Sequence, residues 1–172
     1  MTPLRLLTAF ALLLAAMRPA LAADATFPQG LRVGLTPLVG LALSKTFPGF
    51  ESENHSVKVL VAELPAGAYN EVKTAFTANP PATGSIKPES IETAAGTAYY
   101  TIETAKDGAN PVRRYSMIMP GGTFSGYVAV QVPEDATKIY TDDTVRQMFA
   151  SATIRKEVPV AEQLGTLPFK VT

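Results

Sequence analysis

The chain has 172 residues, a formal net charge of zero at neutral pH, a single histidine, and neither cysteine nor tryptophan. Without cysteine the protein forms no disulfides, thiol nucleophiles or thiolate metal sites, and a balanced charge gives no broad basic field to attract nucleic acid. A chain of this length is expected to form one domain with a substantial core.

Residues 1–22 have the pattern of a secretory signal peptide. Arg5 is followed by the apolar run Leu6–Met17 and then by Ala20-Leu21-Ala22, a small-residue cleavage site. We predict cleavage after Ala22, which leaves a domain over residues 23–172 with a net charge of −2 in the periplasm or outside the cell. An uncleaved membrane anchor is the alternative, but a spanning helix needs roughly 20 apolar residues and this run is shorter. We therefore expect no stable membrane anchor after cleavage.

The first half of the remaining chain predicts short strands and one helix. Leu31–Leu35 and Val57–Leu64 are predicted strands, Leu38–Leu43 is strand or irregular, 47–50 is a turn and 51–56 is a polar loop. A helix should begin at Pro65, because proline suits the first helical position, and end at Asn79-Pro80-Pro81. Tyr69, Val72 and Phe76 share one face of this helix and are predicted to pack.

The second half predicts an antiparallel meander followed by a second helix. The expected strands are Ile86–Ala94, Thr97–Thr104, Val112–Met119 and Phe124–Val132, joined by turns rich in glycine and proline. The second helix should be capped by Thr141, carry Asp142 and Asp143 in its first turn, and bury Val145, Met148 and Phe149. A last strand at Ala152–Arg155 precedes a tail whose apolar residues are expected to pack on the body: Val160, Leu164, Leu167, Phe169 and Val171.

This order of elements predicts an α+β fold, with an antiparallel sheet of about six strands flanked by two helices. The segment Phe47-Pro48-Gly49-Phe50, the strand Val57–Leu64 and the helix after Pro65 together resemble the Mog1/PsbP-like group. That resemblance implies a domain that binds partners or assists assemblies and has no shared catalytic residues. The tail from Val158 to Phe169 also resembles an uncharacterised family of exported proteins from rhizobia-like bacteria, which implies no activity.

Few side chains suggest chemistry. His55 lies in a polar loop with no second histidine to complete a metal site, and Asp142-Asp143 is accounted for by the start of a helix. The pair Glu134-Asp135 does not match a calcium-binding loop, although a weak calcium site stays open. Arg113 and Arg114 are adjacent in a strand and should point to opposite faces of the sheet.

We therefore expect an exported, non-catalytic binding or assembly-accessory domain of the bacterial envelope, with an envelope protein as its partner and no cofactor. Tyr99, Tyr100, Tyr115 and Tyr127 lie on neighbouring predicted strands, and they are the candidate ligand or partner surface. The alternatives are a small hydrolase or calcium-dependent enzyme that uses His55 with a carboxylate, and a carrier of a small apolar ligand.

Overall fold

The computed structural model describes residues 24–78 and 88–165, so the predicted signal peptide lies outside the described residues. The strands are β1 (Val33–Gly34), β2 (Leu41–Leu43), β3 (Gly49–Ser52), β4 (Lys58–Pro65), β5 (Glu89–Thr93), β6 (Gly96–Asp107), β7 (Asn110–Pro120), β8 (Phe124–Pro133) and β9 (Thr153–Ile154). The helices are α2 (Gly67–Ala78), the single 3-10 turn η1 (Glu134–Ala136), α3 (Asp142–Ala150) and α4 (Val160–Gly165). None of the helices in the described ranges is long and apolar enough to cross a membrane.

One antiparallel sheet of seven strands dominates the fold, in the order β2-β3-β4-β8-β7-β6-β5. The meander β5–β8 pairs sequential strands, as expected of neighbours joined by short turns. The pairing of β4 with β8 then joins the two halves of the chain through eight residue pairs. The predicted α+β class is confirmed.

The sequence missed β3, which raises the strand number above the predicted six. Residues 47–50 were predicted as a turn and 51–56 as a polar loop, yet Gly49–Ser52 forms a strand and Phe50 is fully buried. A four-residue strand is too short to show a clear alternation. Gly49 is required here, because a Cβ at this position would lie 1.9 Å from the carbonyl oxygen of Val59.

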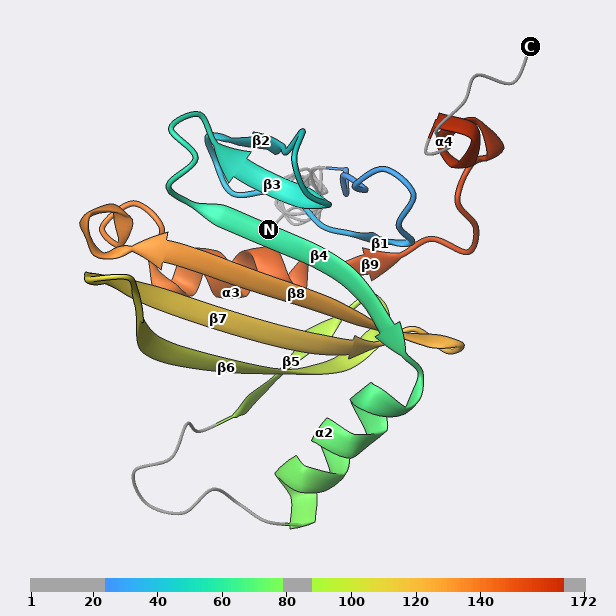
Figure 1. Ribbon diagram of the computed structural model, residues 1–172. Helices are drawn as coiled ribbons and strands as arrows, with labels where there is room; N and C mark the ends of the chain where they lie inside the picture. The colour runs from blue at the N-terminus through green and yellow to red at the C-terminus, as the bar shows by residue number, and fades with distance from the viewer. Residues whose placement is uncertain (1–23, 79–87, 166–172) are drawn as a thin grey trace, which may run out of the picture.

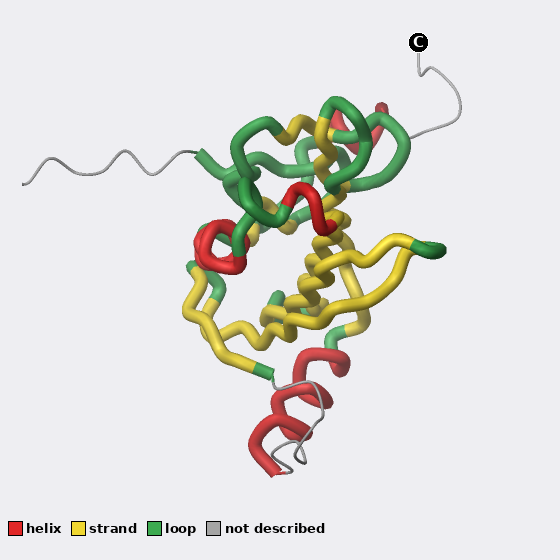
Figure 2. Tube along the Cα trace, turned by 90° about the vertical axis from the view of Figure 1, so that its left-hand side faces the viewer, coloured by secondary structure: helices red, strands yellow, loops and turns green. Residues whose placement is uncertain are grey.

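The core lies between the sheet and α3 (Figures 1 and 2). Alternate residues of the central strands point to α3, as the two-residue period of a strand requires. They include Val59 and Val61 of β4, Tyr115, Met117 and Met119 of β7, and Val128, Val130 and Val132 of β8. Val145, Met148 and Phe149 of α3 are buried against them, and Thr141 caps the helix by accepting a hydrogen bond from the amide of Thr144, both as predicted.

The opposite side of the sheet, which we call the open face, is only partly covered. Helix α2 lies beyond one end of the sheet (Figures 1 and 2), where Tyr69 and Phe76 contact the ring of Tyr99 at centroid distances of 5.8 and 4.8 Å. The prediction that Val72 also packs was wrong, since its side chain is 38% exposed. The helix therefore packs on the sheet through Tyr69 and Phe76, whereas Val72 on the same face is partly exposed.

The tail differs from its prediction. Strand β9 pairs with β1, close to the predicted Ala152–Arg155 strand, and is followed by the unpredicted α4. Val160 and Leu164 are exposed rather than packed, because polar contacts of Glu162 dock this helix. Leu167, Phe169 and Val171 lie outside the described residues.

Candidate functional site

The structure divides the four candidate tyrosines between the two faces of the sheet. Tyr99 and Tyr127 belong to the open face, where both lie beside Ile118 in the strand register. Tyr100 and Tyr115 belong to the α3 face and are buried. The tyrosines therefore form two pairs in different surroundings and not one continuous patch.

Tyr115 is part of a network that ties β7 to the start of α3. Its hydroxyl donates to Oδ1 of Asp142 over 2.8 Å, and Nη2 of Arg113 donates to Oδ2 of the same carboxylate over 2.7 Å. The hydrogen bond from Arg113 lowers the pKa of Asp142, while burial and the bond to Asp142 raise the pKa of Tyr115. Arg113, Tyr115 and Asp142 therefore have a structural role. Asp142 also lies in the first turn of α3, where the helix dipole favours a negative charge.

Tyr100 has an equivalent role beside β5. Its hydroxyl donates to Oε2 of Glu89 over 2.6 Å and accepts from Nε of Arg146 over 2.8 Å. Arg146 reaches Asp143 as well, over 3.0 Å. Both aspartates at the start of α3 thus have arginine partners.

His55 occupies an exposed turn between β3 and β4. Its side chain is 70% exposed and its Nδ1 lies 2.8 Å from Oε2 of Glu51, while the hydroxyl of Ser44 donates to the other oxygen of that carboxylate over 2.7 Å. The carboxylate is therefore in the middle, whereas in a hydrolytic triad the imidazole lies between the nucleophile and the acid. The hydrogen bonds from Ser44 and His55 lower the pKa of Glu51, and the Ser44 hydroxyl bonds to this carboxylate and not to the imidazole.

The turn also explains the conformation of His55. It has a φ of 58°, the only positive φ of a non-glycine residue in the described ranges. Its amide donates to the carbonyl of Ser52 over 2.8 Å and closes the turn, so its position follows from the hairpin geometry. Among the described residues, no group of three or more histidine, aspartate or glutamate side chains is placed to hold a metal ion.

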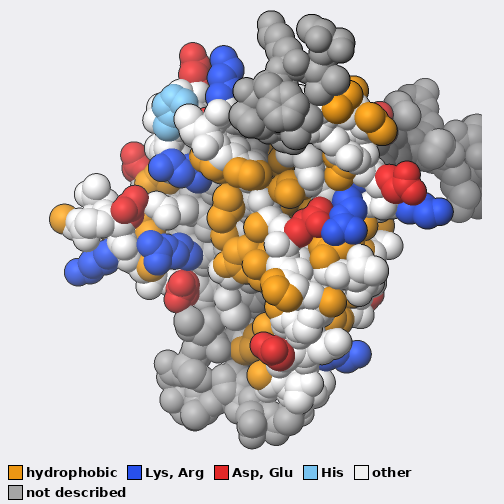
Figure 3. Space-filling view, turned by 45° about the vertical axis from the view of Figure 1, so that its right-hand side comes forward, with side chains coloured by type: hydrophobic (Ala, Val, Ile, Leu, Met, Phe, Trp, Pro, Cys, Tyr) orange, Lys and Arg blue, Asp and Glu red, His pale blue; other side chains and the backbone are white. Residues whose placement is uncertain are grey.

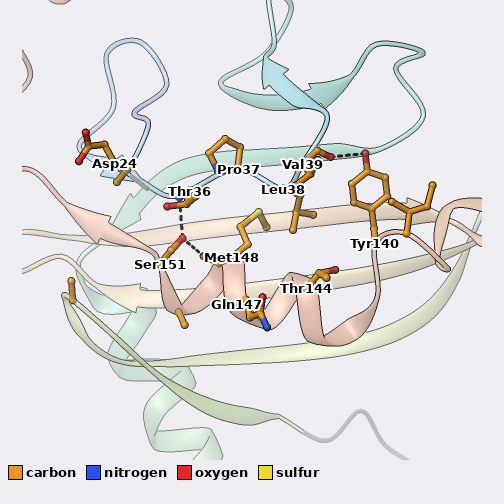
Figure 4. Close-up of a pocket in the computed structure, with 14 residues that line it drawn as sticks. Asp24, Thr36, Pro37, Leu38, Val39, Tyr140, Thr144, Gln147, Met148 and Ser151 are labelled. Atoms are coloured by element: carbon orange, nitrogen blue, oxygen red, sulfur yellow. Dashed lines mark hydrogen bonds between the residues drawn. The ribbon is translucent and has the colours of Figure 1, made fainter. Parts of the chain in front are cut away.

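A large hollow lies beside α3, between the helix and the loop that carries Thr36–Val39. It has a volume of about 680 Å³, and Figure 4 shows Leu38 and Met148 pointing into the space between loop and helix. Two apolar side chains at its rim are unusually exposed, Val39 at 92% and Ile139 at 70%. We call this hollow the α3 pocket.

Polar contacts hold the two walls of the α3 pocket in place. The amide of Thr36 donates to the hydroxyl of Ser151 over 2.9 Å, and that hydroxyl donates to the carbonyl of Met148 over 2.6 Å. At the other end the hydroxyl of Tyr140 donates to the carbonyl of Val39 over 3.1 Å. The loop is therefore fixed to the helix at both ends, and the apolar rim is a preformed surface.

The open face has two further hollows, of about 480 and 310 Å³. Both are lined by Ser116 and Tyr127, so they adjoin, and the smaller one continues under α2 beside Val72. Figure 3 shows a band of hydrophobic side chains down the middle of this side of the molecule, with several Lys and Arg side chains to its left.

Sequence analysis did not find the α3 pocket or the charged end of the open face. Val39 and Ile139 each lie in a short loop segment, about a hundred positions apart, and neither belongs to a periodic pattern. Arg113 and Arg114 do point to opposite faces as predicted, because Arg113 binds Asp142 on the α3 side and Arg114 lines the open face.

No model of a protein family matches this sequence, and no curated protein matches it either. A crystal structure from Bacteroides thetaiotaomicron is similar in fold, with a TM-score of 0.52 and 11% sequence identity over 78% of this chain and 49% of that one. This chain thus spans about half the length of that protein. The solution structure of cyanobacterial PsbP (CyanoP) from Synechocystis sp. PCC 6803 aligns with 81% of this chain and 98% of its own, at 11% identity and a TM-score of 0.46. The likeness to the Bacteroides thetaiotaomicron structure is one of fold alone.

Proposed function

We propose that this protein is an exported, non-catalytic binding domain of the bacterial envelope, and that it binds an apolar segment of a partner protein in the α3 pocket. The observation that carries the proposal is the exposure of Val39 and Ile139 at the rim of a preformed apolar hollow. Exposed apolar clusters beside a concave surface are typical of interaction sites, whereas single exposed apolar residues are ordinary.

The chemistry of the pocket supports a protein partner. Its walls provide aliphatic and methionine side chains, and its rim provides the hydroxyl of Thr144 and the amide of Gln147. An apolar core with a polar rim is the usual anatomy of a protein interface. A hydrolytic function receives no such support, because the best candidate base, His55, is exposed and bonded to Glu51.

Site-specific photocrosslinking in the host tests the proposal. A benzophenone amino acid at position 39 is expected to form one discrete crosslinked product, and the Ile139→Asp substitution should abolish it because a charge would be buried in the interface. Val160, which is 68% exposed on α4, is the matched control position and should form no such product.

The pattern of products decides the question. No product at position 39, or the same product at positions 39 and 160, would overturn the role of the α3 pocket. Export is tested separately by cell fractionation and N-terminal sequencing, and a mature protein that begins at Ala23 is the expected result.

A further inference from the structure

The side chains of the open face change from charged to aromatic along the strands. Register places Lys58, Gln131, Arg114 and Glu103 side by side on β4, β8, β7 and β6. Two residues further along the same face comes a row of mostly small side chains, Leu60, Ala129, Ser116 and Thr101, and the third row is Ala62, Tyr127, Ile118 and Tyr99. Rows of this kind lie about 7 Å apart, since a strand rises about 3.4 Å per residue.

The two hollows follow this change. The larger one covers the charged row and the small row, and the smaller one covers the aromatic row beside α2. Leu60 in the first and Val72 in the second are 39% and 38% exposed, so apolar surface is accessible along the whole length. Their volumes, about 480 and 310 Å³, fall in the range of small-molecule sites.

Arg114 is the unusual cation of this surface. Of the five arginines in the described ranges, four form an ion pair with a carboxylate, namely Arg32, Arg113, Arg146 and Arg155. Arg114 is half-buried in the larger hollow and has no hydrogen bond or ion pair there with any described residue. Glu103 lies directly opposite on β6 without forming an ion pair with it. A half-buried guanidinium without a carboxylate partner is available to a ligand, and an anionic group offers the bidentate geometry that it prefers.

We propose that the open face binds a single-chain anionic amphiphile, of the fatty-acid or lysophospholipid type. Its head group binds Arg114 and Lys58, which are separated by one strand, and its chain crosses Ala129 and Ser116 toward Tyr127. Glu71 lines the far hollow beside α2 and repels an anionic head there, which fixes the direction of the ligand. Glu103 also lines the larger hollow, so the charged side chains described there are two cations and one carboxylate, whereas those described in the smaller hollow are one carboxylate and no cation.

This site can be tested by calorimetric titration. Dodecanoate, kept below its critical micelle concentration, is titrated into the protein purified from its host. We expect saturable binding of one molecule per chain. Arg114→Gln should weaken it by about tenfold, the effect of one lost charge-assisted hydrogen bond. Ala129→Phe should abolish it by filling the hollow. Lys138→Gln, at an exposed lysine away from the open face, is the charge-matched control and should bind as the unaltered protein does.

Ligands with other head groups separate the possible outcomes. Dodecyl maltoside and dodecyltrimethylammonium should bind far more weakly than dodecanoate. A comparison with lysophosphatidylglycerol then identifies the source of the anionic head as free acid or phospholipid. Equal binding of the neutral amphiphile, an unchanged affinity in the Arg114→Gln and Ala129→Phe proteins, or no binding of either anion would overturn the proposal. Urea midpoints of each variant show whether a loss reflects unfolding. The α3 pocket lies on the other side of the sheet, so this inference and the proposed function can fail independently.

Discussion

At the scale of single residues, Asp142 shows how this domain uses charge. Its carboxylate accepts from Arg113 and Tyr115 on β7, and it also occupies the first turn of α3. The neighbouring Asp143 has the same place in the helix but contacts only Arg146 and is 85% exposed. The two aspartates form a natural pair for comparison, because only one of them joins the sheet to the helix.

We predict that Asp142→Asn lowers the free energy of unfolding at pH 7 by about 1 kcal/mol, a value reduced from that of buried charged hydrogen bonds because the side chain is partly exposed. The pKa of Asp142 is lowered in the folded protein, so its contribution is complete above the ordinary carboxyl pKa and is lost as the pH falls through the folded value. Urea denaturation should therefore show a difference in the free energy of unfolding between the two proteins at pH 7 that shrinks as the pH falls below the ordinary carboxyl pKa.

Asp143→Asn provides the control and should cost less at pH 7. An equal cost for both substitutions would show that the helix dipole, and not the contact with β7, accounts for the effect. A difference that does not shrink as the pH falls below the ordinary carboxyl pKa would contradict the assigned role of the charge.

At the scale of elements, one buried hydroxyl connects the start of α2 to strand β8. Ser125 of β8 is fully buried and donates to the carbonyls of Pro65 and Ala66 over 3.0 and 3.2 Å, and it accepts from the amide of Tyr69 over 3.0 Å. The amide of Tyr69 is one of the first N–H groups of the helix, which have no intrahelical acceptor. The Ser125 hydroxyl links α2 to the sheet together with the ring contacts on Tyr99 and the hydrogen bond that the Tyr69 hydroxyl donates to the carbonyl of Thr97 over 2.7 Å.

Ser125→Ala should destabilise the protein by about 1–3 kcal/mol, since the partly buried backbone groups lose their partner. Hydrogen exchange of the α2 amides is expected to speed up more than that of β7 and β8. Ser116→Ala, which removes a hydroxyl that only accepts a 3.3 Å bond from Tyr127, is the control. Equal exchange in α2 for both variants would show that the ring contacts and the hydrogen bond from the Tyr69 hydroxyl to the carbonyl of Thr97 hold the helix without Ser125.

At the scale of the whole molecule, the two ends of the described chain are joined. Strand β1 pairs with β9, and Glu162 of α4 accepts from the amide of Gly30 over 3.2 Å and from Nη1 of Arg155 over 2.8 Å. Helix α4 has no buried residue. The Glu162 carboxylate, whose pKa is lowered by the hydrogen bond from Arg155, therefore contributes directly to the attachment of α4.

We expect Glu162→Ala to release α4 while the core stays intact. Subtilisin should remove the C-terminal segment several-fold faster, whereas the urea midpoint should stay close to that of the unaltered protein, as is usual for surface substitutions. Glu157→Ala, at an exposed position of the same segment, is the matched control. A large fall in global stability would show that α4 belongs to the core.

The sequence by itself determined the elements that have a strong local signal. Strand β8 alternates over eight residues, β4 alternates in part, and α3 carries a cap, an acidic first turn and an apolar stripe, so each was predicted close to its observed limits. The two-residue period of a strand also placed Arg113 and Arg114 on opposite faces. The weaker elements, β3 and α4, were missed because a four-residue strand contains only two repeats of its period and a six-residue helix contains fewer than two turns.

Only the tertiary structure decided which residues share a surface. Tyr99 and Tyr127 come from different strands but both lie beside Ile118, and Val39 meets Ile139 at one pocket. Lys58 and Arg114 share a row only because β4 pairs with β8. A local pattern fixes which side of its own strand a residue occupies, but the pairing and register of distant strands follow from how the whole chain buries its apolar faces.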